Sequence, residues 1–185
     1  MRRTAASTNR HETILARTRA ALLAATMLCL GAAGTAHAED PRFIGDFGAW
    51  AAYTYTIDGA QVCYIASKPT ASRGDYERRG DVFALVTHRM ADGVIGEVSV
   101  VAGYEYQADN FPRAQIGGDT FEMFARGDTA WLRADEDTRM VAAMRRGTEM
   151  VVTGTSSRGT NTTDTFSLMG FTRAHEAITR VCRKN

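Results

Sequence analysis

Residues 47–65, FGAWAAYTYTIDGAQVCYI, decide the fold, because they read as two β-strands joined by a tight turn. Asp58-Gly59 stands between two runs that are rich in β-branched and aromatic residues. Such a dipeptide favours a two-residue turn, whose central residues both need positive φ angles. We therefore predict a β-hairpin with the cross-strand pairs Ala52–Ile65, Tyr53–Tyr64, Thr54–Cys63 and Tyr55–Val62.

This register gives the hairpin two different faces, because successive side chains of a strand point to opposite sides. One face is small and apolar around the thiol of Cys63. The other carries Tyr53, Tyr55 and Tyr64. Such tyrosines either pack at the rim of a core, with their hydroxyls in water, or form an exposed aromatic surface that recognises a protein or glycan. The sequence leaves both alternatives open.

The first 38 residues have the features of a secretory signal peptide. Five arginines precede an apolar run from Ala20 to Gly34, and Ala36-His37-Ala38 follows as an A-x-A site, so we expect cleavage before Glu39. The apolar run is shorter than the roughly 20 residues that span a bilayer, and no later segment is longer. We therefore expect no transmembrane anchor and a periplasmic, outer-membrane-associated or secreted protein.

The remaining residues, 39–185, have the length of a single domain with its own core. Their formal charge is about −3, against +1 for the whole chain. Basic residues are scattered and form no stripe, which argues against nucleic acid as a partner.

Cys63 and Cys182 are the two cysteines that follow the leader. Disulfides persist in the oxidising compartments that exported proteins reach, so we predict a bridge between them. It would join the first hairpin to the last segment of the chain. The alternatives are buried free thiols or a redox site, although no C-x-x-C motif is present.

The rest of the chain is mainly β. Short apolar runs separated by turn residues indicate a two-layer sandwich or a small barrel. The strand candidates lie at residues 81–88, 96–104, 114–116, 120–124, 149–155 and 164–169, and Gly117-Gly118 indicates a further tight turn.

Two short helices are predicted. The first, near residues 135–146, opens with Asp135, Glu136 and Asp137 and ends with two arginines before Gly147, in agreement with helix-dipole and C-cap preferences. The second runs over residues 172–182 with Thr172 as its N-cap. Its apolar stripe consists of Ala174, Ala177, Ile178 and Val181, and it turns Cys182 toward the sheet.

No strong catalytic or metal-binding motif is present. His88 and His175 lack partners at metal-ligand spacing, and no nucleotide-binding loop occurs, so we expect neither metal nor cofactor. Ser156 or Ser157, with His175 and Asp164, could in principle form a serine hydrolase triad, but no G-x-S-x-G motif marks the serine. A small periplasmic hydrolase is therefore the alternative to a non-enzymatic protein.

GTSSRGTNTTDT, residues 154–165, lies between two strand candidates. It is either a polar hairpin loop whose hydroxyls bind nearby backbone groups, or a binding loop on a rigid scaffold with Arg158 as its charged anchor.

The chain resembles the invasion-associated locus B proteins, small exported proteins of alphaproteobacteria. The resemblance rests on FGAWAAYTYTIDGAQVCYIASKP, VTHR, EVSVVAGY, GDTAW and GTSSRGTNTTDTFSLMGFTRAHEAI, in that order. It implies an immunoglobulin-like β-sandwich in the periplasm or at the outer membrane. In pathogenic relatives it also implies a virulence role in invasion of host cells. It supplies no catalytic residue or cofactor, so we expect a binding module whose partner is a protein or a host-cell surface component.

Overall fold

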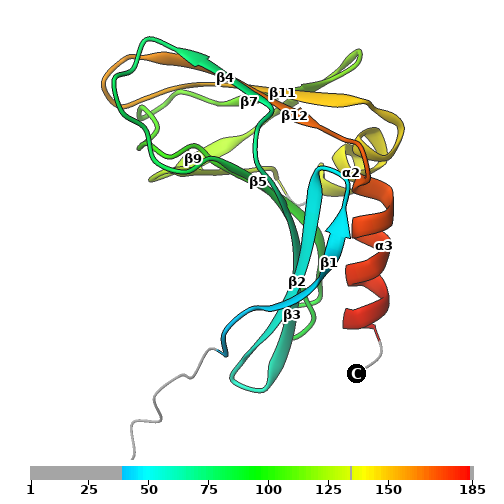
Figure 1. Ribbon diagram of the computed structural model, residues 1–185. Coiled ribbons are helices and arrows are strands. Elements are labelled where there is room, and N and C mark those ends of the chain that lie inside the picture. Colours follow the sequence, from blue (N-terminus) through cyan, green and yellow to red (C-terminus); the bar gives the residue numbers. More distant parts are fainter. Residues whose placement is uncertain (1–38, 134, 184–185) are drawn as a thin grey trace, which may run out of the picture. The chain divides into compact units, whose positions relative to one another are not determined.

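The computed structural model describes residues 39–133 and 135–183 (Figure 1). The predicted signal peptide, residues 1–38, lies outside the described residues and stays a prediction. Within the described residues, the strands form two antiparallel sheets and the helices number two. The predicted fold class, mainly β with two short helices and one disulfide, is confirmed.

The larger sheet has seven strands. Their order in the sheet is β1 (Arg42–Phe47), β2 (Trp50–Ile57), β3 (Ala60–Ser67), β5 (Phe83–Arg89), β6 (Val94–Val101), β10 (Thr129–Trp131) and β9 (Phe124–Arg126). The smaller sheet has five strands, in the order β4 (Ala71–Gly74), β12 (Asn161–Ser167), β11 (Glu149–Thr155), β7 (Arg113–Ile116) and β8 (Asp119–Glu122).

The hairpin of β2 and β3 has the predicted register. Thr54 pairs with Cys63 and Tyr53 with Tyr64. Asp58 and Gly59 have φ angles of 50° and 79°, as the predicted turn requires. The side chains of Ala52, Cys63 and Ile65 are buried on one face, and the tyrosines occupy the other.

The buried face of this hairpin is covered by helix α3 (Phe171–Cys182), which packs along β1, β2 and β3 (Figure 1). The rings of Trp50 and Phe171 meet edge to face, with centroids 5.2 Å apart. The predicted disulfide joins Cys63 to Cys182, with Cα atoms 6.1 Å apart. The N-terminal hairpin and the C-terminal helix are therefore linked covalently as well as by packing.

The predicted start of α3 is wrong by one residue, and Thr172 is not its N-cap. The N-cap is Gly170, which has a φ angle of 88° and makes no side-chain capping bond. A Cβ atom at this position would collide with the carbonyl of Phe47. Glycine is therefore required by the close approach of two backbones, which the residues around Thr172 could not reveal.

Helix α2 (Asp137–Arg146) also departs from the predicted capping. The side chain of Glu136, the N-cap, makes no capping bond and instead binds Arg139, while Asp137 is buried and accepts a hydrogen bond from the backbone N–H of Val98. Gly147 is extended, not left-handed, and a Cβ atom there would lie 2.6 Å from Cγ2 of Ile116. It serves close packing and not a left-handed cap.

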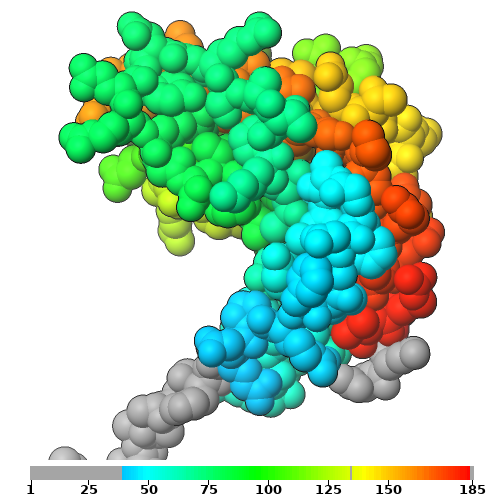
Figure 2. All heavy atoms as spheres, viewed as in Figure 1, coloured from blue at the N-terminus to red at the C-terminus, as the bar shows by residue number. Residues whose placement is uncertain are grey.

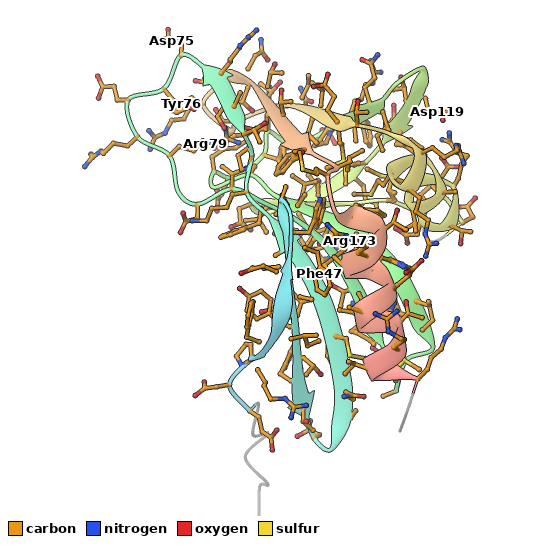
Figure 3. All side chains as sticks on the ribbon, turned by 45° about the vertical axis from the view of Figure 1, so that its right-hand side comes forward. Phe47, Asp75, Tyr76, Arg79, Asp119 and Arg173 are labelled. Atoms are coloured by element: carbon orange, nitrogen blue, oxygen red, sulfur yellow. A yellow bond between two sulfur atoms is a disulfide. The ribbon has the colours of Figure 1, made fainter. Side chains whose placement is uncertain are left out.

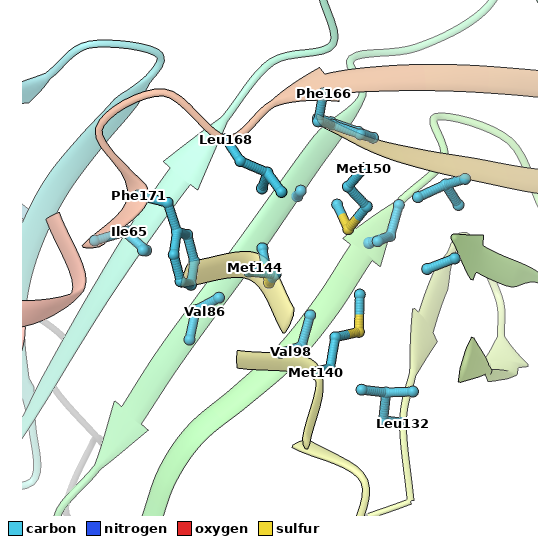
Figure 4. Packing of buried hydrophobic residues seen from close by; sticks show 14 of the residues in the cluster. Ile65, Val86, Val98, Leu132, Met140, Met144, Met150, Phe166, Leu168 and Phe171 are labelled. Carbon is cyan, nitrogen blue, oxygen red and sulfur yellow. The ribbon is translucent and has the colours of Figure 1, made fainter. Parts of the chain in front are cut away.

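The core between the sheets is rich in methionine (Figure 4). Met140 and Met144 of α2 and Met150 of β11 are fully buried with Phe166 of β12. From the larger sheet, Val86 and Val98 belong to the same cluster. The unbranched, polarisable methionine side chains fill an irregular space that a sheet pair and a helix leave between them.

Candidate functional site

A pocket of about 730 Å³ lies where three connecting segments meet. It is lined by residues 75–80 between β4 and β5, by residues 103–105 after β6, and by residues 156–158, 160 and 162 of the β11–β12 hairpin. Asp75, Tyr76 and Arg79 of the first segment project beside this hairpin (Figure 3). The same segment reaches the molecular surface in the space-filling view (Figure 2).

A buried ion pair underlies this pocket. The Arg79 guanidinium donates to both carboxylate oxygens of Asp164, at 2.8 and 2.7 Å, and Nε donates to the carbonyl of Ala102 at 2.6 Å. The two side chains are only 5% and 4% exposed. Ser72 of β4 donates to the same carboxylate at 2.7 Å. The β4–β5 segment is thus bound to β12 and to the end of β6 by one guanidinium.

The charge state of this pair follows from its contacts. Burial alone would lower the pKa of Arg79, but the hydrogen bond and the charge of Asp164 outweigh it, so the pKa lies above its ordinary value. Removing two charges from water costs several kcal/mol per ion, which close bidentate geometry must offset. Such a pair contributes little net stability, but losing one partner is costly.

Aromatic rings enclose the guanidinium. Arg79 lies 4.8 Å from the ring centroid of Tyr104 and 5.5 Å from that of Tyr76. The Tyr104 hydroxyl is 2.6 Å from Oγ1 of Thr162. Burial raises the pKa of Tyr104 and also that of Tyr106, whose ring it meets edge to face, so both phenols are neutral at pH 7. The wall of the pocket is therefore aromatic and hydroxylic, with its one buried cation neutralised.

Close backbone contact joins the first two segments of the pocket. Gly80 donates its N–H to the carbonyl of Gly103 at 2.9 Å. Gly103 has a φ angle of 69°, and a Cβ atom there would collide with the carbonyl of Gly80. Only glycine permits both the conformation and the approach.

Arg158 lies at the rim of this pocket, as an exposed residue in the turn between β11 and β12. The turn is held by Ser156, whose N–H donates to the carbonyl of Thr160 and whose Oγ accepts from the N–H of Thr160. The segment therefore makes the local side-chain bonds expected of a polar hairpin. Arg158 itself is displayed on a turn with fixed geometry.

Tyr53, Tyr55 and Tyr64 form a separate cluster on the larger sheet. The rings of Tyr53 and Tyr64 are stacked with centroids 5.2 Å apart, Tyr55 meets Tyr64 edge to face, and Phe43 of β1 lies against Tyr53. The tyrosines are half-buried and stand on the face opposite the one that α3 covers. None of them lines the pocket that contains Arg158. The residues predicted to form an interaction surface thus lie in two separate places: Arg158 at the pocket and the three tyrosines on the larger sheet.

The members of the hypothetical hydrolase triad bind other partners. Asp164 is engaged by Arg79, and Oγ of Ser156 binds within its own turn. Nδ1 of His175 accepts from Arg145, and among the described contacts no serine hydroxyl binds this ring. The described residues also hold no cluster of three or more His, Cys, Asp or Glu that could bind a metal ion. Within the same residues, no helix has the length and hydropathy of a membrane span.

Arg79, Tyr76 and Tyr104 were not predicted as site residues. The sequence feature that could have indicated Arg79 is Arg78-Arg79-Gly80, where two cations and a glycine stand in a polar segment. It gives no partner, because Asp164 lies 85 positions away.

Comparison with known protein families identifies a match. The model of the family described as "Invasion associated locus B (IalB) protein" matches residues 50–179, from the start of β2 to within α3. No curated protein and no solved structure matches the chain significantly. The match includes Cys63, the pocket segments and the hairpin that bears Arg158, and it ends before Cys182. The chain therefore belongs to the invasion associated locus B (IalB) protein family.

Proposed function

We propose that this protein is a non-enzymatic binding module of the bacterial envelope, which recognises its partner at the pocket bordered by Arg158. The observation that carries the proposal is the construction of this pocket. Three connecting segments are held together by a desolvated ion pair, while the charged residues at the rim are left exposed. A rigid scaffold that displays polar loops is the usual arrangement of a recognition site.

The rim has the composition of a protein-binding surface. Arg158 and Arg78 stand near Asp75, Glu77 and Glu105, so charges of both signs surround an aromatic wall. Arginine and tyrosine are the residue types that contribute most at protein interfaces. The proposed partner is accordingly a protein or a host-cell surface component with its own mixed charges. Nucleic acid, which needs a basic surface, is not proposed.

The description of the matching family refers to invasion, which supports a proposed part in host-cell invasion but names no location. For this chain we propose export by the N-terminal leader, residence in the periplasm or at the outer membrane, and peripheral membrane contact without a transmembrane anchor. The tyrosine cluster with Phe43 is proposed as a second contact surface, because four rings meet on a sheet, with the tyrosines on the face opposite the one that α3 covers.

The experiment is an affinity pull-down from periplasmic and outer-membrane fractions with the purified protein as bait. Arg158→Ala should reduce recovery of the specific partner at least tenfold, because an arginine that is a principal contact of an interface contributes about 2 kcal/mol or more. The matched control is Arg173→Ala, which removes an exposed arginine from α3 (Figure 3). Equal recovery with both variants would exclude Arg158 as a principal contact.

A second variant addresses the tyrosine cluster independently. Tyr53→Ser removes the ring that stacks on Tyr64 and contacts Phe43. A loss of partner with this variant, together with full recovery for Arg158→Ala, would transfer the proposed site to the sheet face.

A further inference from the structure

Two histidines from different elements meet beneath α3. His88 of β5 and His175 of α3 are 1% and 7% exposed, and their rings meet edge to face with centroids 5.2 Å apart. His88 is the cross-strand partner of Cys63, so this pair lies next to the disulfide strand. The predicted buried stripe of α3 did not include His175.

The hydrogen bonds of His88 fix the position of its proton. The backbone N–H of Gly96 donates to Nδ1 at 2.9 Å, so this nitrogen must carry a lone pair. The neutral ring therefore bears its hydrogen on Nε2, which donates to Oγ1 of Thr179 at 3.0 Å. Thr179 in turn donates to the carbonyl of His175 at 2.8 Å. A proton added at Nδ1 would break the bond from Gly96.

The ring of His175 is constrained in the same way. Nδ1 is 2.9 Å from a guanidinium nitrogen of Arg145, at the end of α2. A guanidinium has only donors, so Nδ1 of His175 is the acceptor and cannot hold a proton in this arrangement. Nε2 faces Gly96, where an added Cβ atom would lie 3.8 Å away.

The charged surroundings offer no compensation for a positive imidazole. The charges of His88, Arg145 of α2 and Arg183 at the end of α3 lower the pKa of His175. For His88, a backbone hydrogen bond at Thr87 raises the pKa and the charge of Arg183 lowers it, and burial outweighs both. Arg89 and Glu97, which flank the site on β5 and β6, form an ion pair with each other at 2.6 Å. Glu97 is the cross-strand partner of Thr87, and Thr87 and Arg89 are the two neighbours of His88 along β5, so this ion pair lies on the sheet face opposite His88. On α3, Glu176 and Arg180 are exposed to solvent.

We infer that His88 and His175 form an acid-sensitive latch, in which protonation of either ring releases the C-terminal half of α3 from β5 and α2. Protonation would remove the acceptor for Gly96 or for Arg145 and place a cation beside Arg145 and Arg183. The Cys63–Cys182 disulfide keeps the released helix tethered to β3. Acid would therefore uncover the apolar face of β2 and β3 without separating the two elements. This inference does not depend on the proposed function.

The expected size of the effect follows from proton binding. Burial is the main cause that lowers the pKa of both histidines, and for His175 the charges of His88 and Arg145 contribute to a pKa of about 4. A released helix returns His175 to its ordinary pKa of about 6.5, so the open form binds protons preferentially as the pH falls below 6.5. The equilibrium constant for local opening should rise about 20-fold between pH 7 and pH 5.

Hydrogen exchange of the oxidised protein tests the inference. After correction for intrinsic rates, amides of α3 near Thr179 should exchange about 20-fold more readily at pH 5 than at pH 7. Amides of the β11–β12 hairpin in the same sample serve as the internal control and should change little. Equal changes in both places would indicate global destabilisation and overturn the latch.

The variant His88→Asn/His175→Asn tests whether these two rings cause the pH dependence of exchange in α3. The amide oxygen of asparagine can accept at the position of Nδ1 but does not titrate, so the pH dependence of α3 exchange should disappear. Persistence of the full dependence would overturn the assignment. If the double variant fails to fold, imidazole ¹⁵N shifts of the unmodified protein decide the matter. They should report neutral rings at pH 5.5 in the latched form, whereas ordinary titration near pH 6.5 without loss of α3 protection would contradict the latch.

Discussion

Asp137 places a carboxylate inside the fold, where it accepts the N–H of Val98 at 2.9 Å. Burial raises the pKa of Asp137, the hydrogen bond from Val98 lowers it, and the charge of Glu97 raises it, so that the pKa is about 6. Because the folded chain binds this proton more tightly than the unfolded chain, this group favours folding less as the pH rises from about 4 through 6.

We therefore expect Asp137→Asn to increase the free energy of unfolding by about 1 to 2 kcal/mol at pH 7. The amide oxygen can still accept from Val98, while the buried charge is removed. Urea unfolding at pH 7 and at pH 4.5 measures the effect, and the gain should shrink at the lower pH. A gain that is equal at both values, or a loss at pH 7, would show that the charged form is well accommodated.

Single residues were predicted from the sequence where local chemistry determines them. The Asp58-Gly59 turn fixes the pairing of Thr54 with Cys63, and this register was correct. The cap of α3 was predicted at Thr172 because threonine is a good N-cap, whereas the helix begins after Gly170, beside the backbone of Phe47. That contact joins positions more than 100 residues apart, so no local pattern contains it.

At the scale of elements, the β4–β5 segment depends on one ion pair. Asp164 of β12 binds Arg79 and also Ser72 of β4, and both members of the ion pair are almost fully buried. We expect Asp164→Ala to lower the free energy of unfolding by about 3 to 5 kcal/mol, because Arg79 would remain as an unpaired buried cation. Chemical denaturation monitored by tryptophan fluorescence measures this loss.

The same segment offers a matched control. Asp81 forms an ion pair with Lys68, but these side chains are 77% and 66% exposed. Asp81→Ala should change the free energy of unfolding by no more than about 1 kcal/mol. Similar losses of unfolding free energy for both variants would mean that burial of an ion pair does not determine its contribution to stability.

Several of the strands that were not predicted lack the patterns that mark a strand in a sequence. Strand β4 has the sequence ASRG, all exposed, and is a strand because β12 pairs with it. Strands β9 and β10 have three residues each, too few to display alternation. β5, β11 and β7 were found because apolar runs bounded by turn residues mark them. The pocket itself could not be predicted, since its parts come from three separate connections.

At the scale of the whole molecule, one covalent bond joins the beginning of the fold to its end. Cys63 and Cys182 are 119 positions apart, so their bond restricts most of the unfolded chain. The pair was predictable from sequence because only two cysteines, Cys63 and Cys182, follow the predicted leader and leave a single pairing. The structure adds that α3 packs on β2 and β3, so the bond reinforces a helix–sheet contact and does not hold a loose tail.

We expect Cys63→Ser/Cys182→Ser to lower the free energy of unfolding by about 2 to 5 kcal/mol. The bond lowers the conformational entropy of the unfolded chain, and for a loop of this length that effect approaches 5 kcal/mol. Urea unfolding of the oxidised protein, the reduced protein and the variant measures it. The reduced protein and the variant should have the same free energy of unfolding, because α3 retains its apolar contacts in both.

Mass spectrometry of protein purified without reductant supplies the control, as neither cysteine should accept an alkylating group. Alkylation of both thiols in folded material would contradict the bond, and unchanged stability on reduction would show that packing alone holds α3 to the sheet.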